Sequence, residues 1–77
     1  MASVMKHNQI DIAEYILFII DEFATMFGLT EHQAFRYIKI HGGLDFIEKN
    51  YGIIHTLDDR EAVESVAQFC KRNGGLI

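Results

Sequence analysis

The chain has 77 residues, of which 49% are hydrophobic, no proline, and a formal net charge of -4. This length fits one domain with a single small core, and the negative charge argues against sequence-independent binding to DNA, RNA or an anionic membrane, because such affinity comes from cations that neutralise phosphates. A single cysteine excludes an intramolecular disulfide, and no secretory signal is visible, so we expect a cytoplasmic protein.

The longest apolar segment runs from Ile10 to Phe27. Its apolar residues recur with the period of a helix and cover more than half of the circumference. We expect a helix over residues 9–27 that ends at Gly28, where a left-handed C-cap costs glycine nothing. So wide an apolar face needs cover on two sides, from the rest of the chain or from a second copy. Its longest uncharged run, residues 15–20, is far shorter than the roughly 20 residues that a membrane span requires.

The narrow polar side of this helix is acidic and contains one large aromatic residue. Phe18 lies in line with Glu14 and Asp21, and Glu22 adjoins them. Two interpretations remain open at this point. Another helix, the N-terminal arm or a second copy of the chain covers Phe18, or Phe18 anchors a partner protein while the three carboxylates orient it.

The start of a second helix can be identified from its N-terminal capping residues. Thr30 and Gln33 have the spacing of a capping box, which predicts a helix over about residues 31–41. Its outer face is basic, with Arg36 and Lys39 exposed to solvent. This face is either simply solvated or a small positive patch for an acidic partner surface.

The second half of the chain predicts a short helix and a longer one. The short helix covers about residues 44–51, and the longer one begins after Thr56 or Asp58 and ends before Gly74. Residues 53–56 between them begin with two β-branched apolar residues. We therefore expect an extended connector there, able to pair briefly as a strand.

Together these elements predict an all-α fold. We expect a compact bundle of four helices, three longer and one short, with the short extended connector. The bundle forms a single helical domain over residues 9–77, and residues 1–8 form a flexible N-terminal arm.

No set of residues predicts catalysis or a metal site. The four histidines, His7, His32, His41 and His55, include no pair at i, i+3 or i+4, and there is no second cysteine. An enzyme would have to use His41, His55 or Cys70, and Cys70 lies among apolar residues, where a thiol behaves as a small core residue. We therefore expect a non-enzymatic protein without metal or cofactor.

The second helix, the Gly-Gly turn and the third helix also have the outline of a helix-turn-helix. The alternative function is therefore a small dimeric DNA-binding regulator with Arg36, Lys39 and Lys49 on phosphates. The third helix, however, presents Asp45 and Glu48 where a recognition helix should present Arg, Lys, Asn or Gln to base edges. This composition argues against nucleic acid as the partner.

A series of glycines, aromatic residues and a His-Thr pair follows a recognisable pattern. It consists of Ala34-Phe35, Tyr37, Gly42-Gly43-Leu44-Asp45-Phe46, Tyr51, His55-Thr56-Leu57 and Cys70-Lys71-Arg72-Asn73-Gly74-Gly75. The pattern resembles a group of short bacterial proteins known as domain of unknown function three-seven-nine-one. The resemblance implies a bacterial cytoplasmic protein whose gene neighbours a toxin-like ADP-ribosyltransferase, and hence an antitoxin-like role. It implies no site residues, because the shared positions are structural.

The leading hypothesis is a non-enzymatic protein–protein interaction module. It binds either a partner protein or a second copy of itself as a homodimer. The residues predicted to contact the partner are Glu14, Phe18, Asp21, Glu22, Arg36 and Lys39.

Overall fold

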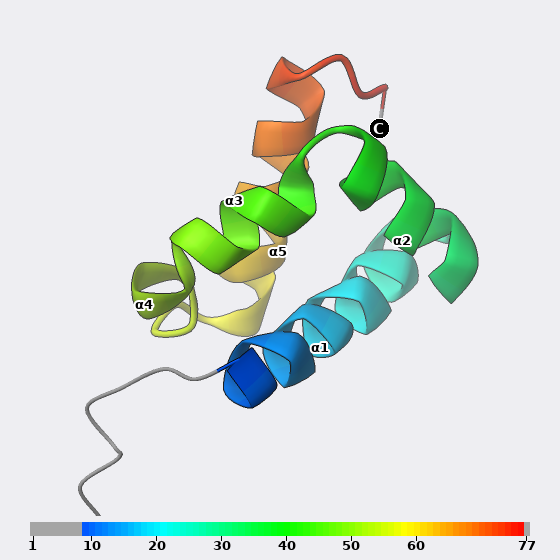
Figure 1. Ribbon diagram of the computed structural model, residues 1–77. Helices are drawn as coiled ribbons and strands as arrows, with labels where there is room; N and C mark the ends of the chain where they lie inside the picture. Colours follow the sequence, from blue (N-terminus) through cyan, green and yellow to red (C-terminus); the bar gives the residue numbers. More distant parts are fainter. Residues whose placement is uncertain (1–8, 77) are drawn as a thin grey trace, which may run out of the picture.

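The computed structural model of the chain describes residues 9–76, and every regular element within them is a helix (Figure 1). These are α1 (Gln9–Phe27), α2 (Glu31–Ile40), α3 (Gly43–Lys49), α4 (Tyr51–Ile54) and α5 (Asp59–Arg72). The all-α prediction is confirmed. The flexible arm predicted for residues 1–8 lies outside the described residues, as does residue 77.

The junction between α1 and α2 follows the sequence signals closely. Gly28 has a φ of 67°, the left-handed conformation that ends α1. The Thr30 hydroxyl accepts a hydrogen bond from the Gln33 backbone N–H at 3.0 Å, and the Gln33 side-chain oxygen accepts one from the Thr30 N–H at 2.9 Å. The predicted capping box is therefore confirmed, and it fixes where α2 begins.

The extended connector predicted over residues 53–56 is wrong. The described residues contain no strand, and α4 occupies the first part of this segment. The Asn50 carbonyl accepts from the backbone N–H groups of Ile53 and Ile54 at 3.0 and 2.8 Å. The Thr56 hydroxyl donates to the Ile53 carbonyl at 2.7 Å. These bonds favour a turn, which buries Ile54 and leaves Ile53 exposed, over the β-propensity of the two isoleucines.

The core is apolar and receives side chains from all five helices. α1 contacts α2, α3 and α5, and in Figure 1 α5 lies behind α3. No described helix is long and apolar enough to cross a bilayer. The buried apolar residues are Ile19, Ile20, Phe23, Ala24, Ala34, Ile38, Ile47, Ile54, Ala62, Val63, Val66, Ala67 and Cys70.

The ends of α2 and α5 are tied together. His41 Nδ1 lies 3.1 Å from the Asn73 carbonyl oxygen, and the Gly75 N–H donates to the Cys70 carbonyl at 2.9 Å. The Tyr37 hydroxyl lies where a side chain on Gly75 would have to go. Four residues of the pattern noted in the sequence therefore help to close this end of the bundle: Tyr37, Cys70, Asn73 and Gly75.

Candidate interaction surface

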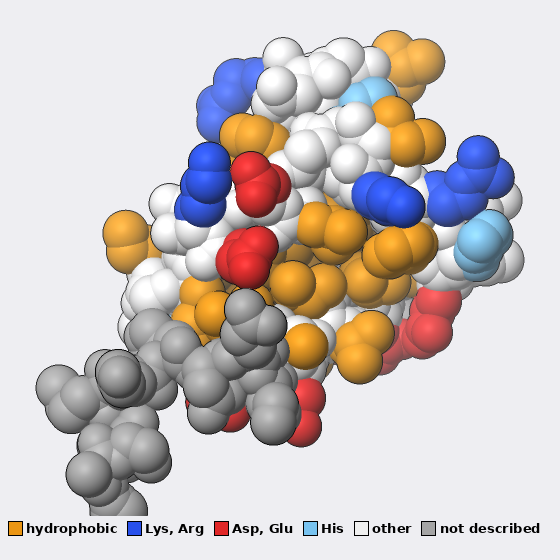
Figure 2. Space-filling model, viewed as in Figure 1, with side chains coloured by type: hydrophobic (Ala, Val, Ile, Leu, Met, Phe, Trp, Pro, Cys, Tyr) orange, Lys and Arg blue, Asp and Glu red, His pale blue; other side chains and the backbone are white. Residues whose placement is uncertain are grey.

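One surface of the molecule leaves apolar side chains uncovered between α1, α2 and α3. Figure 2 shows hydrophobic side chains gathered there in one contiguous area. Leu17, in the middle of α1, is 67% exposed. A groove of about 270 Å³ lies between α3 and the part of α1 that precedes Leu17. We call this surface the apolar face, and it comprises Ile12, Ala13, Ile16, Leu17, Phe35 and Leu44.

The apolar face exists because the helices around α1 cover it unevenly. On its other side, the N-terminal half of α1 is covered by α4: the Tyr15 ring meets the Tyr51 ring edge-on at 5.3 Å, and the Tyr15 hydroxyl donates to the Ile54 carbonyl at 3.3 Å. Leu17 points to the side that α4 does not reach. The apolar stripe of α1 is therefore covered along one edge and open along the other.

The boundary between α1 and α2 is marked by two carboxyls. Asp21 on α1 lies near Glu31 on α2, and hydrogen bonding of the protonated Glu31 to Asp21, together with the negative charge of Asp21, raises the pKa of Glu31. One turn further along each helix lie Leu17 and Phe35, and the Phe35 ring is 36% exposed. Both side chains therefore border the same seam between the two helices.

Opposite charges flank the apolar face. Glu48, on α3, lines the groove. Lys39, on α2, holds its ammonium 5.7 Å from the centre of the Phe35 ring. Figure 2 shows acidic side chains on the α3 side of the hydrophobic area and basic ones on its α2 side. The rim is thus acidic at the α3 edge, whereas at the α2 edge the basic side chain of Lys39 lies further along the seam from Asp21 and Glu31.

The acidic residues predicted to bind a partner lie along α1. Glu14 and Asp21 are exposed, and Glu22 is partly exposed. Phe18 is partly buried and packs against the core, with its ring 6.0 Å from the Tyr15 ring. Phe18 is therefore partly covered by its own chain, which leaves Leu17 as the most exposed large apolar residue of α1 among residues 11–27, whose burial is described.

The basic residues predicted for the same role, Arg36 and Lys39, are exposed on α2. Lys39 borders the apolar face through Phe35. Sequence reasoning did not single out Leu17, Leu44 or Phe35, because it placed Leu17 and Phe35 on inward-facing sides of their helices. The signal that could have found them is the difference in length between α1 and α2.

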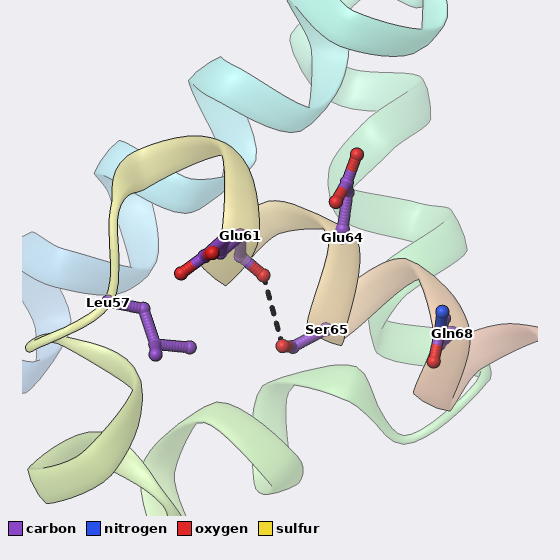
Figure 3. Close-up of a pocket in the computed structure, with 5 residues that line it drawn as sticks. All are labelled: Leu57, Glu61, Glu64, Ser65 and Gln68. Atoms are coloured by element: carbon purple, nitrogen blue, oxygen red, sulfur yellow. Dashed lines mark hydrogen bonds between the residues drawn. The ribbon is translucent and has the colours of Figure 1, made fainter.

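Two further hollows lie beside α5. The first, of about 310 Å³, is lined by Leu57, Glu61, Glu64, Ser65 and Gln68. Figure 3 shows the Ser65 hydroxyl turned to the backbone of Glu61, to whose carbonyl it donates at 3.0 Å. The second, of about 400 Å³, lies between the end of α1 and the start of α5, and its lining includes three carboxylates and Arg60. The Ser65 hydroxyl thus bonds to its own helix rather than to another side chain of the first hollow.

Cys70, His41 and His55, the residues considered for catalysis, each interact with their own fold. Cys70 is buried, and its burial raises the pKa of the thiol to about 11. His55 Nδ1 lies 2.7 Å from the Tyr51 carbonyl oxygen, and His41 Nδ1 lies 3.1 Å from the Asn73 carbonyl oxygen. Within residues 9–76, no cluster of three or more His, Cys, Asp and Glu side chains could hold a metal ion. His7 lies outside the described residues.

Comparison with known proteins places the chain in a family. No curated protein and no solved structure is detectably similar to it. A family model described as protein of unknown function (DUF3791) matches residues 14–73, the part of the chain that contains α2 to α5 and α1 from Glu14 onward. The resemblance noted in the sequence is therefore confirmed, and the chain belongs to the DUF3791 family.

Proposed function

We propose that this chain is a non-enzymatic module that binds another protein through the apolar face. The observation that carries the proposal is Leu17, which is 67% exposed on a helix whose next turns, at Ile20 and Ala24, are buried. Apolar area left in water costs free energy that a partner recovers by covering it. An apolar centre with a charged rim is the usual composition of such an interface.

The chemistry of the remaining residues supports binding over catalysis. A buried thiol with a pKa of about 11 is protonated at neutral pH and is therefore a poor nucleophile. The ring nitrogens of His41 and His55 that face the protein meet backbone carbonyls. Neither histidine faces a nucleophile that it could activate.

Charge favours a protein over DNA as the partner. Lys49 on α3 pairs with Asp45 at 3.5 Å, and Glu48 is exposed beside them. A helix with this balance would repel phosphates. The family resemblance adds a finer proposal, in which the partner is a toxin-like enzyme encoded by a neighbouring gene and this chain acts as its antitoxin.

The test is a charged substitution at the centre of the apolar face. Leu17→Asp should abolish co-purification with the co-expressed product of the neighbouring gene, because it places a charge in the desolvated part of the interface. Ile53→Asp is the matched control, since Ile53 is 70% exposed on α4, at the far end of α3 (Figure 1). Both variants should keep the helical circular dichroism and melting temperature of the wild type.

Retention of the neighbouring protein by Leu17→Asp, with Ile53→Asp behaving identically, would contradict the proposal. If that protein is a toxin, the same variants give a second readout. Cells that express the toxin should grow with the wild-type chain and with Ile53→Asp. They should stop growing with Leu17→Asp.

A further inference from the structure

We infer that the apolar face also binds the same face of a second copy of this chain, forming a two-fold symmetric dimer. The inference rests on the proposed function, because it uses the same face, and it names one partner for that face. Three observations carry it: the opposite charges on the two edges, the groove beside Leu17, and the uneven cover of α1.

The charged edges make the face complementary to itself. Glu48 lines the groove at the α3 edge, and Lys39 borders Phe35 at the α2 edge. Consider a two-fold axis that lies in the interface, parallel to the two edges and midway between them. Rotation about this axis brings the acidic edge of one copy onto the basic edge of the other. Glu48 of each copy then faces Lys39 of the other, and the contact occurs twice.

At the α3 edge, one carboxylate remains unpaired by a neighbouring cation among the described residues. Asp45, the other acidic residue on α3 near this edge, is paired with Lys49 at 3.5 Å. Glu48 therefore supplies the net negative charge beside the groove. Lys39 keeps its ammonium over the Phe35 ring, which holds a positive charge at the border of the apolar area.

The shape of the face also fits a second copy. The groove of about 270 Å³ is lined by Ile12, Ala13, Ile16 and Leu44 as well as Glu48, and Leu17 projects beside it with 67% of its surface exposed. Leu17 of each copy can enter the groove of the other. The N-terminal half of α1 then receives from the second copy the cover that its C-terminal half receives from its own chain.

The experiment reverses the charges of the rim one at a time. Lys39→Glu and Glu48→Lys each place like charges opposite one another at both symmetric contacts. Each should therefore weaken the dimer about tenfold or more in sedimentation equilibrium at low salt. Both residues are exposed, so the melting temperature at low protein concentration should not change. Ile53→Asp, which lies off the face, should dimerise as the wild type does.

Mixing the two single variants is the decisive measurement. In a mixed dimer each contact again joins one acidic and one basic side chain, so the mixture should recover the wild-type dissociation constant while each variant alone does not. The double variant Lys39→Glu with Glu48→Lys should also recover it. A structural effect within one chain would not be reversed by mixing.

Each outcome separates this inference from the proposed function. A wild-type chain that stays monomeric at several hundred micromolar, or single variants that mixing does not restore, overturns the dimer. If Leu17→Asp still loses the neighbouring protein in that case, the proposed function stands. If the dimer forms as inferred and Leu17→Asp keeps the neighbouring protein, the inference stands and the binding of that protein occurs elsewhere.

Discussion

The two halves of α1 carry the same apolar stripe but differ in how the fold uses it. In the C-terminal half, Ile19 and Phe23 are fully buried, and Ile20 is 6% exposed. In the N-terminal half, Ala13 is exposed and Leu17 is 67% exposed. An apolar stripe in the sequence therefore predicts that a helix face will be covered, but it does not predict whether the same chain or another one covers it.

The length of α2 explains the difference. α1 has 19 residues and α2 has 10, which correspond to about 28 and about 15 Å of helix. The capping box at Thr30 fixes the start of α2, and Gly42, with a φ of 79°, turns the chain away after its end. α2 therefore cannot cover the whole stripe, and α3 and α4 cover only part of what remains.

The largest expected contrast is between two alanine substitutions on α1. Phe23→Ala removes a fully buried ring and should lower the free energy of unfolding by about 3–5 kcal/mol. Leu17→Ala should change it by less than about 0.5 kcal/mol, because its side chain is already in water. Urea denaturation at a protein concentration below that of any self-association measures both.

A cost at Leu17 approaching that at Phe23 would contradict this contrast. It would mean that the N-terminal half of α1 is covered in the isolated chain. Repeating the measurement at high protein concentration separates the two sources of cover. If Leu17→Ala lowers the free energy of unfolding only at high protein concentration, Leu17 is covered by a second copy of the chain and not by its own fold.

The start of α3 offers the next contrast, between two glycines. A methyl group on Gly43 would lie 2.6 Å from Ile38 Cγ2 and 3.0 Å from the Cys70 sulfur. Gly43→Ala should therefore cost about 1–3 kcal/mol through overpacking. Gly28→Ala is the control: nothing lies within 4 Å, and only its φ of 67° opposes a side chain, which costs about 1–2 kcal/mol.

This contrast bears on the apolar face because Gly43 lets α3 approach α2 and α5 closely. If Gly43→Ala pushes α3 away from them, α3 moves relative to α1 and the groove changes shape. The larger loss should therefore come at Gly43, together with a change in dimer affinity. Gly28→Ala should leave that affinity unchanged. An equal loss at both glycines would show that the close approach is not needed.

Much of the fold could be predicted from the sequence because its signals are local. The bounds of α1 follow from its periodicity and from Gly28, and the start of α2 follows from the Thr30 and Gln33 pair. The segment 53–56 could not, because its conformation depends on hydrogen bonds that the Asn50 carbonyl accepts from nearby N–H groups and on the one that the Thr56 hydroxyl donates to the Ile53 carbonyl. These bonds override the strand preference of Ile53 and Ile54.

The candidate surface was only partly predictable. Sequence reasoning identified a surplus of apolar area on α1, and it named Lys39, which borders the face. It selected Phe18 as the anchor, because an aromatic residue stands out in a polar stripe. Leu17 did not stand out, since its exposure depends on how far α2 extends along α1, which is a tertiary property.

The smallest expected effect lies at the boundary between α1 and α2, where Asp21 lies near Glu31. The hydrogen bond to Asp21 and the charge of Asp21 raise the pKa of Glu31 in the folded chain. A group that binds its proton more tightly when folded stabilises the fold fully below its unfolded pKa, about 4.3 for Glu. That stabilisation is lost as the pH rises through the raised value.

Glu31→Gln keeps a hydrogen-bond donor toward Asp21 without the charge, so this pH-dependent loss should disappear. Glu31 is also the first residue of α2, where the helix dipole favours a negative charge, and this opposes the effect of Asp21. Because the group is exposed, the two melting temperatures should diverge only slightly between pH 4 and 7, with the wild type falling relative to Glu31→Gln. Parallel curves would show that the two carboxyls do not meet, and the seam between α1 and α2 would then be more open beside Leu17.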